Sequence, residues 1–318
     1  MSDQQQANMV QSFEMLCTAV YEPDDSLPSD QMTEKVRQAQ NRIMQIIKSQ
    51  AFWGQVQIIL TKTSNNYAIT IAANAYRDFM TQQWHRFSAE DRVNVRVFVM
   101  RIMRAKVEIL THASRMALIS LVTRVSKLGW FDDERHQSIV EDAQKLLIPD
   151  HPASYCLGID LLAQLVDEMN RPLRNESVTD HRKIAVSFRE QQLKAIFQAA
   201  LTCIREVSRR PDSPTKIKMC NVGVNLAIKC LRYDFIGTNP DDSMIEMANI
   251  HVPTTWRHIM QDKNVIPVLF QVFKSSRSVK ACRLVCVLRR FTYNRSLLCV
   301  HHHHHQACIV TRVSSLRR

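Results

Sequence analysis

Apolar residues recur along this chain at alternating steps of three and four positions, the spacing that places side chains on one face of an α-helix. One such stripe consists of Leu118, Leu121, Val125 and Leu128, and similar stripes continue through most of residues 1–273. An amphipathic helix in a globular protein needs its apolar face covered by a neighbour. The chain is therefore expected to fold as many helices packed side by side.

The striped segments come in pairs that are separated by short polar or proline-containing corners. Pairs begin near residues 8, 51, 88 and 134, a period close to the roughly 40–47 residues of HEAT and armadillo units. The predicted helices cover residues 8–21, 30–49, 51–60, 66–84, 107–128, 134–147, 152–171, 216–233 and 256–273. Two more helices are predicted without fixed ends. One begins with a capping box at Ser88, and the other contains Leu193 and Ile204.

Glycine is scarce, with 5 residues among 318, whereas proteins average about 7%. Sheet proteins depend on glycine for tight turns. The scarcity therefore argues for helices and against sandwich, barrel and dinucleotide-binding folds. We predict an all-α fold, a right-handed α-solenoid of HEAT-like antiparallel helix pairs (an ARM/HEAT superhelix) with a long concave surface.

The corner that follows residue 128 joins two of the predicted pairs. Gly129 is expected to end the first helix in a left-handed conformation. Trp130 and Phe131 are expected to pack between the two units, and Asp133 to cap the next helix. The four tryptophans Trp53, Trp84, Trp130 and Trp256 all fall at helix ends or corners, where they are expected to anchor helix packing rather than to bind a ligand.

The net charge of +12 is not spread evenly. From Lys274 onward there are 10 Lys or Arg and no Asp or Glu, so residues 1–273 are nearly neutral. Residues 274–318 also lose the helical stripes. We therefore expect a HEAT array at 1–273 and a separate basic tail at 274–318, which is disordered or an aberrant translation product.

Sequence motifs for chemistry are absent. No phosphate-binding loop, nucleophile elbow or zinc-binding helix motif occurs, so the chain is predicted not to be an enzyme, with no catalytic residues, no cofactor and no metal site. The run His301–His305 is expected to bind metal only adventitiously. His136 and His181 are expected to lie on a solvated surface. The leucine-rich segment 161–169 is expected to be a core stripe rather than an export signal.

The N-terminal residues lack the pattern of a secretory signal, and no apolar run approaches the roughly 20 residues of a membrane span. The 9 cysteines show no regular framework. We expect a soluble intracellular protein with reduced thiols.

Four short segments carry a resemblance to a known family: KLGWFD from residue 127, HRKIAVSFRE at 181–190, YDFIGT at 233–238 and VPTTWR at 252–257. Their order and spacing resemble the exportin-7 branch of the importin-β (karyopherin-β) family of nuclear transport receptors. The match covers roughly residues 10–273 and corresponds to the N-terminal third of such a receptor, with an importin-β N-terminal-like region at about 30–105.

The resemblance implies a monomeric receptor that binds protein cargo together with the GTP form of the GTPase Ran. It also implies shuttling between nucleus and cytoplasm through contacts with phenylalanine-glycine nucleoporins. By position in the array, the helices at 66–84 and 107–128 would contact Ran. The candidate contact residues are Asn74, Arg77, Asp78 and Arg115.

Two other functions are compatible with the sequence. A HEAT array can serve as an interaction scaffold that does not depend on Ran. The ten unopposed cations of the tail can also attract nucleic acid without sequence specificity.

Overall fold

The computed structural model describes residues 2–22, 26, 28–148, 150–174, 176–210, 213–234 and 254–260, together with the single residues 262, 264, 267 and 272. The basic tail at 274–318, the histidine run and most of the predicted last helix lie outside these residues.

Within the described residues the chain folds into helices and contains no strand. The helices are α1 (Asp3–Tyr21), α2 (Ser29–Lys48), α3 (Gln50–Lys62), α4 (Asn66–Gln83), α5 (Ala89–Ala105), α6 (His112–Leu128), α7 (Ile139–Gln144), α8 (Pro152–Asn170), α9 (Val178–Phe188), α10 (Lys194–Ser208), α11 (Pro214–Leu231) and α12 (Arg257–Met260).

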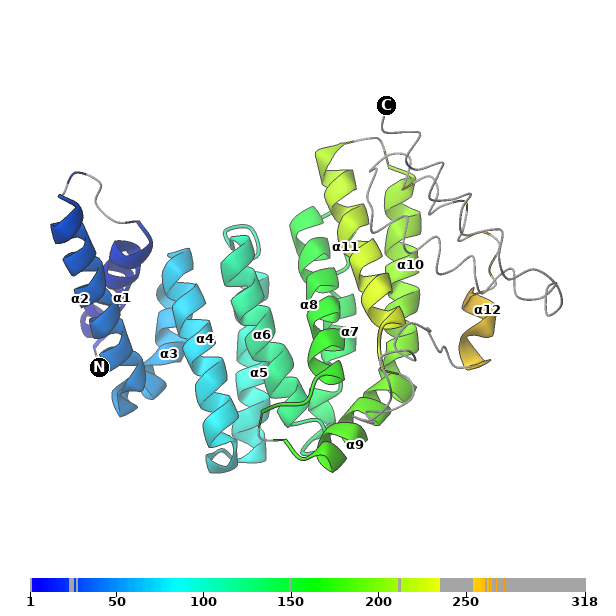
Figure 1. The fold of residues 1–318 in the computed structure, drawn as a ribbon, viewed down its shortest axis with the longest axis horizontal. Helices are drawn as coiled ribbons and strands as arrows, with labels where there is room; N and C mark the ends of the chain where they lie inside the picture. The colour runs from blue at the N-terminus through cyan, green and yellow to red at the C-terminus, as the bar shows by residue number, and fades with distance from the viewer. Residues whose placement is uncertain are drawn as a thin grey trace.

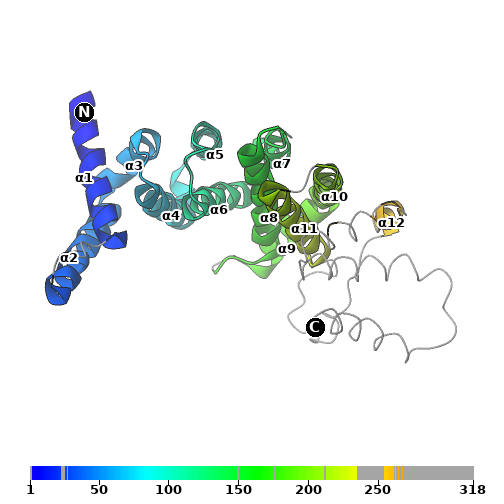
Figure 2. The ribbon, with the colours of Figure 1, turned by 90° about the horizontal axis from the view of Figure 1, so that it is seen from above.

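Antiparallel helix pairs stack along one axis and form two layers (Figure 1). One layer contains α1, α3, α5, α7 and α10, and the other contains α2, α4, α6, α8 and α11 (Figure 2). In the second layer α4 packs on α6, α6 on α8, and α8 on α11. Figure 2 shows that the stack is curved and that the second layer lies on its concave side. The predicted α-solenoid is confirmed, and we call the second layer the inner layer.

Helix boundaries follow local signals in the sequence. Ser88 opens α5 with the predicted capping box, in which its hydroxyl accepts the amide of Asp91 at 3.1 Å. Several boundaries differ from the prediction. The helix predicted at 8–21 begins at Asp3, because Ser2 caps it. The helix predicted at 107–128 begins only at His112, because Thr111 caps it after a turn. The helix predicted at 134–147 is divided into a short 3-10 turn, Glu134–His136, and α7.

The segments α9 and α10 form one helical run that a stretch of π-helix interrupts at Arg189–Leu193. A π-bulge inserts an extra residue and bends a helix. In Figure 1 this run starts beneath α8 and then turns upward beside α11.

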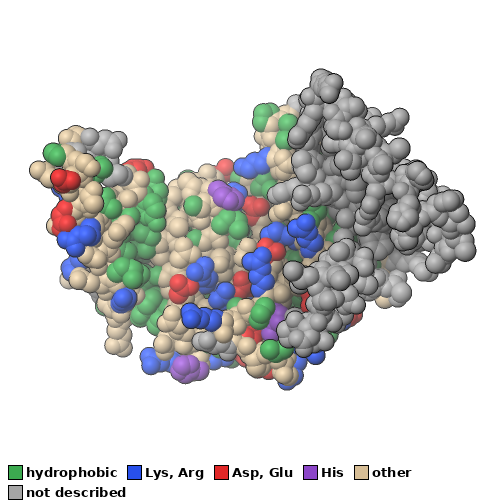
Figure 3. Space-filling model, viewed as in Figure 1, with side chains coloured by type: hydrophobic (Ala, Val, Ile, Leu, Met, Phe, Trp, Pro, Cys, Tyr) green, Lys and Arg blue, Asp and Glu red, His purple; other side chains and the backbone are tan. Residues whose placement is uncertain are grey.

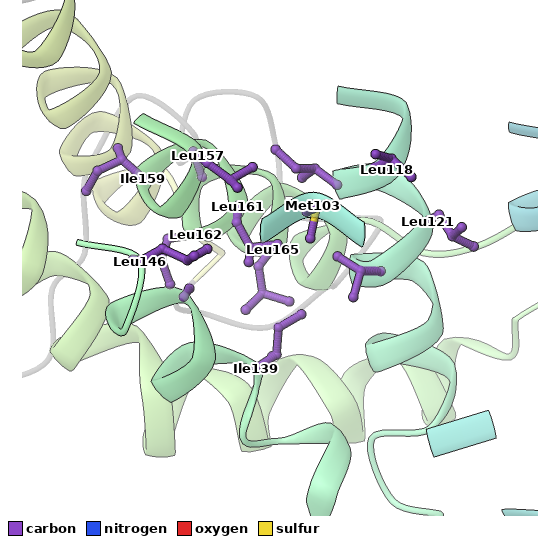
Figure 4. Packing of buried hydrophobic residues seen from close by; sticks show 14 of the residues in the cluster. Met103, Leu118, Leu121, Ile139, Leu146, Leu157, Ile159, Leu161, Leu162 and Leu165 are labelled. Atoms are coloured by element: carbon purple, nitrogen blue, oxygen red, sulfur yellow. The ribbon is translucent and has the colours of Figure 1, made fainter. Parts of the chain in front are cut away.

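The core contains most residues of the predicted stripes, but Met32 and Val36 of the stripe predicted at 30–49 are only partly buried. Figure 4 shows side chains from α5, α6, α7 and α8 that converge between the layers. The leucine-rich segment 161–169 is core rather than signal, since Leu161, Leu162 and Leu165 are fully buried. Burying each such side chain contributes about 1.5–3 kcal/mol, so the stack is held together mainly by contacts between neighbouring units.

The corner after α6 needs glycine for a reason that differs from the prediction. Gly129 has φ −88°, which any residue can adopt, so it is not left-handed. Instead the ring of His136 lies directly on its Cα, and an added Cβ would come within 2.4 Å of two ring atoms. Glycine is required here by a close approach.

The aromatic residues of this corner divide between core and surface. Trp130 is fully buried, whereas Phe131 is 60% exposed, so the prediction that Phe131 packs between units was wrong. The chain reverses at this point, which allows only one of two adjacent side chains to face inward. Asp133 accepts the amide of Arg135 at 2.8 Å and caps the 3-10 turn, as predicted.

The other three tryptophans also sit in packing positions. Trp53 stacks on Phe79 with ring centroids 3.8 Å apart, and Trp84 donates its Nε1–H to Asp132 at 3.0 Å. Trp256 is buried against Phe197. The predicted anchoring role is confirmed for these described contacts.

The prediction that His136 and His181 are solvated was wrong, because both are buried. His136 fills the space over Gly129, and His181 lies 3.3 Å from the Nζ of Lys127. Charged neighbours in the sequence suggested a surface position, but tertiary packing places both rings between helices. Burial lowers the pKa of each imidazole, to about 4 for His136.

We expect Gly129→Ala to destabilise the protein by about 1–3 kcal/mol, because the new methyl group overlaps the ring of His136. Urea unfolding followed by circular dichroism measures the change. Gly54→Ala is the matched control, since nothing lies within 4 Å of its added Cβ, and in the helix interior alanine should stabilise by up to about 1 kcal/mol.

Gly129→Ala also tests whether glycine is required by the close approach of the His136 ring or by the backbone conformation of the corner. In a His136→Ala background the cost of Gly129→Ala should largely disappear, because the overlapping ring is gone. A cost that stays the same in both backgrounds would show that backbone conformation, and not the ring, demands the glycine.

Acid should destabilise the fold through His136. The unfolded chain binds a proton near the ordinary pKa of 6.5, whereas the folded chain binds it only near 4, so stability is lost as the pH falls from about 6.5 to 4. The loss should reach up to about 3 kcal/mol relative to His136→Phe. If both proteins show the same pH dependence of unfolding over this range, His136 is not the responsible group.

Candidate functional site

The inner layer forms the surface on which the predicted Ran-contact residues lie. Asn74, Arg77 and Asp78 belong to α4, and Arg115 belongs to α6. This is the face seen in Figure 3, where charged side chains of both signs lie among uncharged ones. The structure therefore brings the four candidates onto two neighbouring helices of one face.

Arg77 is the centre of a small polar cluster. Its Nη1 donates to Asn74 Oδ1 at 3.2 Å and to Ser120 Oγ on α6 at 3.1 Å. Its Nη2 forms an ion pair with Asp78 at 2.8 Å. Arg77 thus contacts two of the other three candidates, Asn74 and Asp78, and it also links α4 to α6.

Arg115 is engaged differently. Its Nη2 forms an ion pair with Asp160 on α8 at 2.9 Å, and the side chains of this pair are only 12% and 16% exposed. Burial raises the pKa of Asp160, and the positive charge of Arg115 opposes that rise. Arg115 therefore serves first as a link between α6 and α8.

Two further basic residues, Arg124 and Lys229, extend this series of links across the inner layer. Arg124 on α6 donates to Thr81 on α4 at 3.3 Å and forms an ion pair with Glu168 on α8. Lys229 on α11 forms an ion pair with Asp167 on α8 at 2.5 Å. We call the links made by Arg77, Arg115, Arg124 and Lys229 the inner ladder.

Sequence reasoning missed Arg124, Asp167, Glu168 and Lys229. None of the four belongs to an apolar stripe, so the sequence pattern assigns each to the solvated polar face of its helix. Asp160 and Asp167 are seven residues apart and so lie on one face of α8. Only the stacking of α4, α6, α8 and α11 shows that these polar positions meet.

The candidates differ in how open they are to a partner. Asp78 has a side chain that is 56% exposed, and that of Arg77 is 26% exposed. Because Arg115 is largely covered and paired, Asp78 and Arg77 are more accessible than Arg115. Such a surface can bind a partner by charge and shape complementarity, and its mixed signs favour a partner with a matching mixed pattern.

The described residues contain no constellation for metal chemistry, since no group of three His, Cys, Asp or Glu could hold an ion. Five described cysteines are buried and free. Burial raises the pKa of the Cys203 thiol to about 12, so this sulfur is protonated and unreactive at neutral pH. No helix among the described residues is both long enough and apolar enough to span a bilayer.

A second feature lies at the end of the inner layer, where α6, α8 and α9 meet. The Nζ of Lys127 is fully buried and contacts the carbonyl of Arg171 at 2.5 Å, Glu176 at 3.0 Å and Nδ1 of His181 at 3.3 Å. An ammonium group has three donors, and each has an acceptor here. Burial lowers the pKa of Lys127, and the hydrogen bond with Glu176 opposes this.

Aromatic contacts continue this corner. Trp130 donates to Ser187 at 3.0 Å, and its ring lies edge-on to Phe188 with centroids 5.7 Å apart. Phe188 also contacts Tyr233, whose hydroxyl donates to the carbonyl of Ala185 at 2.9 Å. Three segments that are far apart in sequence, from residues 127, 181 and 233, therefore meet at one place.

These three segments are the ones that carry most of the sequence resemblance. The corner holds the long helix α9–α10 against the inner layer, and so sets the course of the stack beyond α8.

No family model matches this chain. Among curated proteins it is 27% identical over 303 residues to Exportin-7-A of Xenopus laevis, across 92% of this chain and 27% of that protein. It is 29% identical over 309 residues to Ran-binding protein 16 of Drosophila melanogaster, across 90% of this chain and 27% of that protein.

Ran-binding protein 17 of Mus musculus is 26% identical over 272 residues, across 83% of this chain and 24% of that protein. The chain spans about a quarter of the length of these relatives. Proteins with exportin-7 and Ran-binding names thus match nearly the whole of this helical array, and the chain is related in sequence to the exportin-7 branch of the karyopherin-β family.

Proposed function

We propose that this chain is part of an exportin-7-like nuclear export receptor, which binds Ran in its GTP form together with protein cargo. The observation that carries the proposal is the match of about nine-tenths of the chain to proteins named exportin-7 or Ran-binding protein. In such a receptor this chain would bind partners through its surface and would catalyse no reaction.

The inner layer supports this function physically. A concave face built from α4, α6, α8 and α11 offers a large area to a folded partner, as solenoids generally do. Asp78 and Arg77 are accessible there, and Asn74 and Arg115 flank them within the same polar surface. We propose these four residues as Ran contacts, with Asp78 and Arg77 contributing most.

The remaining parts of the proposal concern the setting of the receptor. We propose that it acts as a monomer, contacts phenylalanine-glycine nucleoporins and shuttles between nucleus and cytoplasm. The array at 1–273 would include the importin-β N-terminal-like region at about 30–105, and the basic tail at 274–318 would not contribute to Ran binding.

The proposal predicts selective recovery of Ran-GTP. The immobilised full chain should retain Ran loaded with a non-hydrolysable GTP analogue and not Ran loaded with GDP. The double variant Arg77→Ala, Asp78→Ala should weaken this binding about thirtyfold, because truncating central charged contacts at about 1 kcal/mol each costs about 2 kcal/mol together.

The matched control is Arg101→Ala, Glu141→Ala, an exposed pair of opposite charges on α5 and α7 in the other layer, which should bind Ran-GTP as the unaltered chain does. If the chain retains both nucleotide states of Ran equally, or neither of them, the proposal is wrong. The alternative function, a HEAT scaffold that does not depend on Ran, would then remain. The third possibility is that the tail binds nucleic acid without sequence specificity. Deleting residues 274–318 should then abolish nucleic-acid binding and leave binding of Ran-GTP unchanged.

A further inference from the structure

A groove lies at the N-terminal end of the array, between α1 and α2 and beside the N-cap residue of α4. It has a volume of about 580 Å³, which is within the roughly 300–1,000 Å³ of pockets that bind ligands. Figure 3 shows apolar side chains gathered in the recess next to α2. None of the residues that line the groove belongs to the inner ladder.

The walls of the groove are apolar and rich in methionine. Met15 and Ala19 on α1 face Met32 and Val36 on α2. The side chain of Met15 is largely open to solvent, since this residue is 67% exposed. Methionine side chains are flexible and polarizable, so they adapt to different apolar groups, and they are frequent on surfaces that bind helices.

The rim of the groove is acidic. Glu14 and Glu22 line it, and Lys35 is the one cation among the lining residues. Glu22 accepts the hydroxyl of Tyr67 at 3.0 Å, and Glu14 accepts the hydroxyl of Thr63. These neutral donors orient the carboxylates without cancelling their charge.

The part of the chain that supplies most of the groove is acidic. The described residues among 2–34 contain five Asp or Glu and no Lys, Arg or His, of which Asp3 is paired with Lys62 and Glu34 with Arg37. Lys106, which does not line the groove, interacts electrostatically with Glu14. A charged groove with apolar walls attracts ligands of the opposite sign.

The shape of the groove favours an elongated ligand. Its α1 wall runs from Gln11 to Glu22, which is three helical turns or about 16 Å. We propose that this groove binds an amphipathic helix of a partner protein that carries leucine or methionine on one face and Lys or Arg beside them. Apolar anchors would enter between Met15 and Met32, and the basic groups would pair with Glu14 and Glu22.

The test uses a fluorescent 14-residue peptide of leucine and lysine, with leucine at helical spacing, and the full 318-residue chain. Anisotropy titrations should show saturable binding that weakens with salt. A peptide in which glutamate replaces every lysine should bind at least about tenfold more weakly, because like charges would then face each other. A scrambled leucine–lysine peptide controls for charge alone.

Substitutions in the groove locate the binding. Met15→Ser should weaken the lysine peptide about tenfold by removing an apolar anchor, and its exposed position makes loss of folding no concern. Glu22→Gln should weaken the lysine peptide about threefold and reduce the salt dependence. Met44→Ser on α2 is the matched control, because Met44 is 46% exposed and does not line the groove.

Several results would overturn the proposal. They are equal binding of the lysine, glutamate and scrambled peptides, no binding of the lysine peptide, or equal effects of Met15→Ser and Met44→Ser. Sedimentation would reveal a concentration-dependent dimer, and a dimer abolished by Met15→Ser would assign the groove to a second copy of this chain instead. The groove lies outside the ladder and the assay contains no Ran, so its outcome is independent of Ran binding.

Discussion

The whole structure depends on the burial of each helix pair against the next one. A single pair has an apolar stripe that it cannot cover, and the stripe becomes core only when α4 packs on α6, α6 on α8, and α8 on α11. Stability in such an array is therefore the sum of contacts between neighbours. The same stacking sets the shape of the molecule, since the stack is curved and its inner layer lies on the concave side.

Polar interactions add order to this apolar stack rather than strength. The inner ladder joins successive helices through half-buried pairs such as Arg115–Asp160, and buried pairs contribute little net stability but disfavour other registers. At the corner, the three acceptors around Lys127 leave one arrangement in which the ammonium group is satisfied. A partner bound to the inner layer would meet side chains that are already held in place, which lowers the entropic cost of binding.

Much of the fold was predictable, since helix periodicity is a local property. The stripe at Leu118, Leu121 and Val125 and the capping box at Ser88 appear in the structure as predicted. Local reasoning failed where the deciding neighbour is elsewhere in the chain or in space. Gly129 was assigned a left-handed conformation because the ring of His136 above it is not visible in the sequence pattern, and Phe131 was assigned to the core because it adjoins Trp130.

The sequence by itself determined the class of fold, the helix pairs and their order, because the spacing of apolar residues selects helices and short corners make consecutive helices antiparallel. It also carried the family resemblance. The tertiary structure decided which polar residues meet: that Arg77 reaches Ser120, that Lys127 reaches His181, and that Met15 faces Met32 across an open groove. These contacts join residues on different helices, and their geometry is set by how the helices stack, which no local pattern contains.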